Sequence, residues 1–508
     1  MVTKIIIIID IYHLLSAYLS LLHIANSIFT VNKLTKHYCY LAEETNVTNH
    51  NMKNLLKLLS ILFAAAFLFA ACEGPMGPAG EDGADGADGA DGADANETCK
   101  LCHNSTVVGA VQPQFELSKH SYGEAAFEEA GNTTCTPCHA SEAFKYVCKN
   151  NIPATFTLNT TTGKYSNNYV ATAATAIGSL SCFTCHSNLH TNYTSTEFLP
   201  LTTTAAVPMT MWKASKTINL SQDGGVSNLC SKCHQPRPLT TSSSLSTGDV
   251  VDYASLVTNP TVTFYDNVVG NAAPNKLLPS YRMHVHYGTV GAVYAGTGGV
   301  EFTGSQTYAN SPHTAGASCV DCHMAPMSGR AGAHTFKVRS GEGALTSSTT
   351  WNFQGCNVSG CHSANPISSS STIWTATRNE IKTLLNTLAT KINVIGNGTD
   401  ILHSDTDGES NLWAGLTTGN YDGYLNIYDP SSNSTGVWKN PGSTSSWTQA
   451  QRDTNNALPV FPSLKNVHVG AMVNFQFGLR EFSLGIHNFK YSKALLQNSI
   501  DALTAAGY

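Results

Sequence analysis

Charged residues are scarce in this sequence, and those present do not form a basic face. Only 12% of the 508 residues are Asp, Glu, Lys or Arg, which is about half of the usual share. The formal net charge is −6 and no run rich in Lys or Arg occurs, so we expect no nucleic-acid partner. Ser, Thr, Asn and Gly take the place of charge, which is typical of an exported protein with long polar loops.

A long uninterrupted apolar run is also lacking. Residues 52–71 have a basic start, a short apolar core and small residues before Cys72. A core this short does not span a bilayer comfortably, so we predict a secretion signal. Its ending, Phe-Ala-Ala-Cys, resembles the bacterial lipobox, whose cysteine is lipidated and becomes the mature N-terminus. We therefore expect a lipoprotein signal peptide at 52–71, and a lipid on Cys72 that anchors the protein to the outer membrane at the cell surface.

The segments on either side of this signal are expected to lie outside the folded part. Residues 1–51 contain an apolar run at 5–29 that polar residues interrupt. We expect 1–51 to be an untranslated or mis-assigned leader, with a transmembrane anchor at 5–29 as the alternative. Behind Cys72, glycine recurs at every third position from 74 to 92, which is the collagen period. The triplets are few and filled mostly with Ala and Asp, so for 72–97 we favour a hydrated acidic spacer over an assembled triple helix.

The cysteines fit neither a disulfide framework nor zinc knuckles. Of the 15 cysteines, 12 form pairs followed directly by His; five pairs enclose two residues and one encloses four. Zinc ribbons have no use for a His after each pair, and disulfide frameworks do not show one. Cys39, Cys72 and Cys148 stand outside the pairs. The motif cysteines are Cys99, Cys102, Cys135, Cys138, Cys182, Cys185, Cys230, Cys233, Cys319, Cys322, Cys356 and Cys361.

Cys-x-x-Cys-His is the attachment signature of c-type haem. Two thiols form thioethers with the porphyrin vinyl groups, and the adjacent His binds the iron. In the wider motif at 356–362, Ser359 and Gly360 would allow a bulge that still presents both sulfurs. A Cys356–Cys361 disulfide or an unmodified site is the alternative there. We therefore predict six haem c groups, whose proximal iron ligands are His103, His139, His186, His234, His323 and His362.

The second ligand of each iron decides between an electron carrier and an enzyme. An iron with two strong ligands transfers electrons, whereas an open position can bind a substrate. Nine further histidines follow the leader outside the motifs, so all six irons can be closed; Met is the less favoured ligand. Alternation would put His284 and His286 on one face of a strand, with His286 favoured. His403 is assigned to the surface, and His468 to either a ligand or the core. The predicted distal ligands are His120, His190, His286, His313, His334 and His487.

Two stretches resemble bacterial exported multihaem cytochromes c, including the nitrite reductase and hydroxylamine oxidoreductase superfamily. They are SPHTAGASCVDCHMAP…GRAGAHTF and GIHNFKYSKALL. In those families a His before the motif, one after it and one at a late helix are distal ligands, which implies this role for His313, His334 and His487. The lipidated Gly/Asp-rich start resembles surface metal-reducing cytochromes. The Cys-x-x-Cys-Lys motif of the nitrite reductases is absent from the sequence, so no catalytic residue is implied.

The motifs and the resemblance imply the fold of a multihaem cytochrome c. We expect a mostly irregular and α-helical chain with sparse short strands, a haem-packed core over 98–365, and a helical C-terminal part at 366–508 that supplies distal ligands. Apolar stripes predict helices at 377–394 and 490–504, with a polar loop region at 396–455 between them. In the long gap between the fourth and fifth motifs, VVDYASLV and TVTFYDNVV predict short strands.

Together these features predict an electron carrier more than an enzyme. Six bis-His haems at the cell surface would pass electrons between other redox proteins or extracellular acceptors, in extracellular respiration. One alternative is an oxidoreductase of a small nitrogen or sulfur compound with one open haem. Another is a subunit of a cytochrome filament. The last motif, at 356–362, opens onto the haem-free C-terminal part, so it is the first candidate for an open iron.

Overall fold

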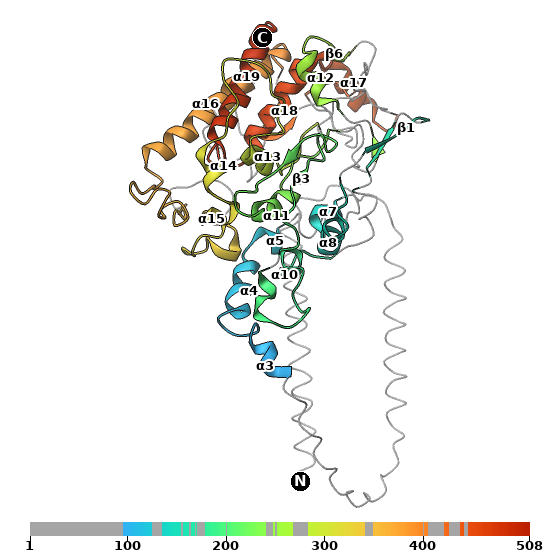
Figure 1. Cartoon of the computed structure of the whole chain (residues 1–508). Coiled ribbons are helices and arrows are strands. Elements are labelled where there is room, and N and C mark those ends of the chain that lie inside the picture. Colours follow the sequence, from blue (N-terminus) through green and yellow to red (C-terminus); the bar gives the residue numbers. More distant parts are fainter. Residues whose placement is uncertain are drawn as a thin grey trace, which may run out of the picture. The chain divides into compact units, whose positions relative to one another are not determined.

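The structure, a computed structural model, consists of helices and short strands joined by long irregular segments (Figure 1). The predicted leader, the signal peptide and most of the spacer lie outside the described residues. Among the residues that the structure describes, no helix combines the length and the apolar character of a membrane span. The described residues are 95–123, 135–153, 156–161, 164–167, 169, 178–199, 201–239, 247–248, 251–267, 283–340, 349–399, 401–404, 421–425, 437–440 and 445–508.

Three helices near the C-terminus pack against one another. They are α16 (Thr372–Ile395), α18 (Asn466–Arg480) and α19 (Phe489–Ala505), drawn in orange to red in Figure 1. Residues three and four apart on a helix share a face, and the apolar stripes of α16 and α19 are buried accordingly. Both helices were expected from these stripes, and the structure confirms them.

Helix α18 was not predicted from the sequence. All of its residues are buried, so it has no polar face and no stripe to recognise. Gly470 lets a neighbouring ring approach closely, because a Cβ there would come within 2.4 Å of the Phe302 ring. The helix is therefore enclosed by the rest of the fold rather than lying on its surface.

Two amide side chains of α18 hold the segment that precedes the fifth motif. Asn474 accepts a hydrogen bond from the Val300 amide at 2.8 Å and donates to the Val300 carbonyl at 2.7 Å. Gln476 accepts from the Val285 amide at 3.1 Å and donates to the Met283 carbonyl at 2.8 Å. These buried backbone groups have no strand partner, so the amides supply the hydrogen bonds that a sheet would otherwise give.

The strands form small antiparallel sheets. These are β1 (Phe156–Asn159) with β2 (Lys164–Asn167) and β5 (Thr247–Gly248); β3 (Val207–Pro208) with β4 (Thr217–Ile218); β6 (Thr263–Tyr265) with β9 (Leu464–Lys465); and β7 (Leu402–Ser404) with β8 (Tyr421–Leu425).

Of the two predicted strands, one is present and one is wrong. TVTFYDNVV contains β6, which pairs with β9 from the C-terminal part. VVDYASLV instead forms helix α12 (Tyr253–Thr258). The Asp252 side chain caps α12 by accepting from the amides of Ala254 and Ser255, and such a cap favours a helix start over a strand.

The other helices are short and include most of the haem-attachment motifs. They are α3 (Ala95–Lys100), α4 (Val108–Glu116), α5 (Lys119–Tyr122), α7 (Thr136–His139), α8 (Ser141–Lys149), α10 (Cys182–Cys185), η2 (Ser195–Phe198), α11 (Val226–Cys233), α13 (Val290–Ala295), α14 (Pro312–Gly316), α15 (Cys319–His323), η3 (Ala333–Thr335) and α17 (Gln449–Ala457).

A hydrophobic core made of the polypeptide itself runs through both parts of the chain. It combines buried side chains between Val207 and Phe302 with others between Ile381 and Leu503. Trp438, from the region expected to be a polar loop, is buried in it. The segment between Val207 and Phe302 thus has a side-chain core of its own, where packing against haems alone was expected.

Replacing Asn474 by Ala should destabilise the folded protein by roughly 1–3 kcal/mol. The buried Val300 amide would lose its acceptor, and the Val300 carbonyl would keep only the hydrogen bond from the Phe302 amide. The unfolding midpoint of the haem-loaded protein, followed by circular dichroism, would measure this. Asn379→Ala, at an exposed position of α16, is the matched control and should shift stability by less than about 0.5 kcal/mol. Equal unfolding midpoints for the two variants would contradict a stabilising role of the hydrogen bonds between Asn474 and Val300.

Candidate haem sites

The regular haem-attachment motifs form tight turns that end at the motif histidine. In four of them the His amide donates to the carbonyl of the first cysteine, and the fifth motif is itself helix α15. One turn therefore carries both sulfurs and the imidazole. The N···O distances are 2.8 Å for His103 and Cys99, 3.1 Å for His139 and Cys135, 2.9 Å for His186 and Cys182, and 2.9 Å for His234 and Cys230.

The wider motif closes in the same way in spite of its two extra residues. The His362 amide donates to the Cys356 carbonyl at 3.0 Å, although six residues separate them instead of four. Gly360 has φ +84°, a left-handed conformation that favours glycine, and Val358 in the bulge is 43% exposed. The extra residues thus loop outward, as the sequence predicted, while the first cysteine and the histidine keep the relation found in the regular motifs.

Histidines from distant parts of the chain face the motif histidines. Five of the six motif rings lie 5.8–6.2 Å, centre to centre, from one of the predicted distal ligands. The pairs are His103 with His190 at 5.8 Å, His234 with His120 at 6.1 Å, His139 with His286 at 6.1 Å, His362 with His313 at 6.2 Å and His323 with His487 at 6.2 Å.

The remaining two histidines of the predicted set also lie near each other. Desolvation lowers the pKa of His334, and the charge of His186 lowers it further. Each predicted distal ligand therefore has a different motif histidine as its neighbour. Closeness in the sequence does not give these pairings. His120 precedes the second motif but faces His234 of the fourth, and His334 follows the fifth motif but lies near His186 of the third.

This spacing is what two imidazole ligands of one iron would have. Two metal–nitrogen bonds of about 2 Å each, together with the distance from each nitrogen to its ring centre, separate the ring centres by about 6 Å. The cysteines, the proximal histidines and their facing histidines therefore fit six haem c groups. In the described parts of the chain, no three His, Cys, Asp or Glu side chains gather into a metal site made of protein groups alone.

Several motif imidazoles are held in the neutral form, which is the form that binds iron. Desolvation lowers the pKa of His234 to about 3, helped by the charges of neighbouring histidines such as His120 and His323. Desolvation also lowers the pKa of His323 to about 4, with a further contribution from His487. Burial and the close approach of several imidazoles thus favour the neutral form of these rings.

The histidines left without an assigned role lie elsewhere. His284 is buried, and its Nδ1 accepts from the His286 amide at 3.1 Å. His286 has φ +70°, so the two do not alternate on a strand as expected; a turn at His286 directs that ring to His139. His468 is buried, accepts from the Lys465 amide at 3.1 Å and packs edge-on against the Tyr508 ring, as a core residue does. The side chain of His403 lies outside the described residues.

The cysteines of different motifs lie near one another. The Cys233 thiol donates to the Cys138 carbonyl at 3.6 Å, and the Cys319 amide donates at 2.9 Å to Ser227 Oγ on the helix that carries Cys230. Gly355, next to Cys356, lies so close to the Asp321 carbonyl that a Cβ there would be 2.0 Å from it, which puts the sixth motif beside Cys322. The Cys230 thiol is the largest cause that lowers the pKa of Cys319 to about 7. The second, fourth, fifth and sixth motifs are therefore neighbours in that order. The third motif lies near the fourth, because Cys185 interacts electrostatically with both Cys230 and Cys233.

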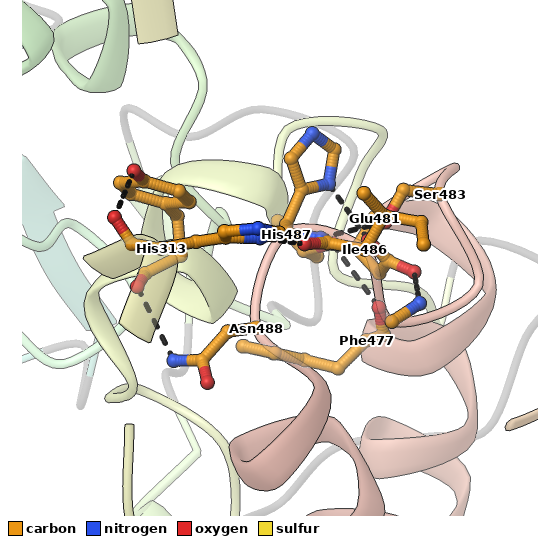
Figure 2. A network of polar contacts seen from close by, with 10 residues as sticks. His313, Phe477, Glu481, Ser483, Ile486, His487 and Asn488 are labelled. Atoms are coloured by element: carbon orange, nitrogen blue, oxygen red, sulfur yellow. Dashed lines mark hydrogen bonds and ion pairs between the residues drawn. The ribbon is translucent and has the colours of Figure 1, made fainter. Parts of the chain in front are cut away.

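The loop between α18 and α19 supports two of the facing histidines. His487 Nδ1 lies 2.8 Å from a carboxylate oxygen of Glu481, and His313 Nδ1 lies 2.9 Å from the Ile486 carbonyl. Figure 2 shows these residues around the loop. Asn488 accepts from the Ser311 amide at 2.9 Å and so ties this loop to the helix that carries His313. The sites of the fifth and sixth motifs thus share one loop.

Glu481 is a functional candidate that the sequence reasoning missed. Burial raises its pKa, but hydrogen bonds from His487, Ser483 and Gly485 lower it overall. Burial lowers the pKa of His487, while the bond to Glu481 and its charge raise it overall. The available signal was the alternation Glu-x-Ser-x-Gly-x-His at 481–487, whose members converge only when the loop is folded.

Cys148, which among the described cysteines lies outside the motifs, should be a free and unreactive thiol. Desolvation raises its pKa to about 11, opposed by Lys232 and reinforced by Cys138. Its thiolate fraction near pH 8 would then be roughly 100-fold below that of an ordinary cysteine. Iodoacetamide should alkylate it slowly in the native protein and rapidly after denaturation, with mass spectrometry locating the label. Equal rates in the two states would contradict the assignment.

Comparisons with known proteins give no relative for this chain. No protein-family model matches the sequence, and neither a curated protein nor a solved structure matches it. The candidate haem sites therefore stand on the residues and geometry of this chain.

Proposed function

We propose that the protein is an exported electron carrier that binds six haem c groups, each through two cysteines and two histidines. One observation carries the proposal: every motif histidine has a different predicted distal histidine as its neighbour, five of them at ring separations of 5.8–6.2 Å. Chance placement would not give every motif a partner of its own.

The chain's residues have distinct parts in this function. The cysteines would hold each porphyrin covalently, and the turn that carries them would aim the adjacent histidine at the iron. The facing histidine would occupy the position where a substrate would bind. The haem supplies the one-electron chemistry when bound, and the protein supplies ligation, spacing and desolvation.

Contacts between the motifs support a continuous path for electrons. Contacts between the motif turns order the second, fourth, fifth and sixth sites, and Cys185 of the third interacts electrostatically with both cysteines of the fourth. The first and third sites share a short segment, since His190 faces His103 and follows His186 closely. The fourth site is then a junction with three neighbours.

The two alternatives receive less support. An oxidoreductase with an open haem needs a motif histidine without a partner, and the sixth motif, the first candidate for this, has His313 at 6.2 Å from His362. A filament in which a neighbouring copy lends a ligand needs a motif histidine without a neighbour from its own chain, and in the described residues each motif histidine has a predicted distal histidine nearby.

The location and the partners belong to the same proposal. Lipidation of Cys72 would anchor the protein to the outer membrane, and the acidic spacer at 72–97 would hold the haem sites away from it. Partners would be other redox proteins or extracellular electron acceptors, and no nucleic acid is expected.

Mass spectrometry of the purified protein should count six covalent haems, and the Cys356→Ala, Cys361→Ala double variant should retain five. The reason is that the wide motif keeps the turn of the regular ones, with the His362 amide on the Cys356 carbonyl. Five haems in the unaltered protein would favour an unmodified or disulfide-bonded sixth site.

His313→Ala should convert one of the six irons to a high-spin form that binds cyanide, because it removes the imidazole facing His362. Electron paramagnetic resonance and cyanide titration would measure this. His468→Ala is the matched control: it removes a core histidine that faces no motif, and all irons should stay low-spin. High-spin iron in the unaltered protein would instead favour the oxidoreductase.

A further inference from the structure

The carboxylate of Glu481 is completely buried and receives three hydrogen bonds from the loop that follows α18. Ser483 Oγ donates to one of its oxygens at 2.5 Å, and the Gly485 amide donates to the other at 2.7 Å. His487 Nδ1 lies 2.8 Å from the oxygen that Ser483 contacts (Figure 2). One carboxylate oxygen is therefore shared by Ser483 and an imidazole opposite a haem motif, and the other is held by a backbone amide.

The loop is folded around this carboxylate. Phe482, Leu484 and Gly485 have φ of +58°, +56° and +86°, and the two non-glycine residues adopt this left-handed conformation only under strain. The His487 amide also donates to Ser483 Oγ at 3.0 Å, so backbone and side chain of His487 are both tied to the same group of residues. Such a turn orients the ring as well as hydrogen-bonding it.

Two other imidazoles at the candidate sites, His313 and His323, have a backbone carbonyl as partner instead. His313 Nδ1 lies 2.9 Å from the Ile486 carbonyl, and His323 Nδ1 lies 2.9 Å from the Phe336 carbonyl. A carbonyl carries only a partial negative charge, whereas a carboxylate carries a full one. A carboxylate on the far nitrogen of an iron-binding imidazole makes that imidazole a stronger electron donor, which stabilises the oxidised iron.

We propose, on the basis of the proposed function, that Glu481 is a positioning and tuning residue that gives the haem of the fifth motif the lowest reduction potential of the six. It acts through His487, which faces His323 at 6.2 Å. Reduction adds one electron to this iron, while the Nδ1 proton stays in the hydrogen bond to Glu481, so no proton is released or taken up.

Because of its position, a low reduction potential at the fifth site would affect electron transfer between the other sites. The fifth site lies between the fourth and the sixth, because the Cys319 amide donates to Ser227 on the helix of the fourth motif and Gly355 of the sixth packs against the Asp321 carbonyl. A low potential there places an uphill step between the fourth-site junction and the sixth haem. When the protein holds few electrons, the first four haems and the sixth haem would be reduced independently of each other, and the fifth haem would be reduced last.

Glu481→Gln tests the proposal, because the amide oxygen keeps a hydrogen bond to His487 and removes the negative charge. Redox titration of the full haem-loaded protein, followed in the visible spectrum, should show an upward shift of the lowest midpoint potential and little change in the other five. One of the low-spin ferric signals in electron paramagnetic resonance should shift with it. Glu380→Gln is the matched control, since this carboxylate pairs with Lys493 at 2.7 Å on the surface and should leave all six potentials in place.

Ser483→Ala keeps the proposal testable if Glu481→Gln does not fold. It removes one neutral donor from the carboxylate and leaves its charge, so His487 takes a larger share of that charge and the lowest potential should move downward. A general disturbance of the loop would not give shifts of opposite sign in the two variants.

An unchanged lowest potential in Glu481→Gln, or shifts of equal sign in both variants, would overturn the role of Glu481. Six covalent haems and an all-low-spin spectrum would in that case still support the electron-carrier function. A haem count below six or open irons in the unaltered protein would count against the function itself, and this is measured separately from the potentials.

Discussion

The structure depends on bringing pairs of imidazoles, most of them far apart in the chain, to within about 6 Å of each other inside the molecule. Packing alone gives no reason for such pairs, since each buried ring must either lose its charge or find a partner. The lowered pKa values of His234 and His323 follow from this crowding. The rest of the fold can be understood as a scaffold whose packing offsets the cost of burying these imidazoles and keeps each pair in place.

Helix α18 is the centre of that scaffold. Its buried amides hold the segment around Val285 and Val300, and so set the position of His286. Its last turn leads directly into Glu481 and the loop that supports two further histidines. A single enclosed helix thus links the C-terminal part to sites on both sides of the long gap between the fourth and fifth motifs.

Helices α16 and α19 could be predicted from the sequence, because a half-buried helix carries an apolar stripe. The motif cysteines and histidines could be recognised by their spacing, and six of the remaining histidines were named as their partners without a pairing. Other features could not be predicted, for physical reasons. Helix α18 has no exposed face to produce a pattern. The helix at Tyr253 depends on a cap from Asp252 that outweighs the β-branched residues around it. The pairing of histidines with motifs, and the role of Glu481, arise only from contacts between distant segments.

The closeness of cysteines from different motifs bears on how the protein is assembled. Cys230 with Cys319, and Cys322 with Cys356, are neighbours in the folded chain. An oxidising compartment converts neighbouring thiols to disulfides, which would lock two motifs together and block both. A chain that folded before its cofactors were attached would therefore trap itself. If the motifs carry haem as proposed, this packing requires that attachment to the cysteines precedes closure of the fold.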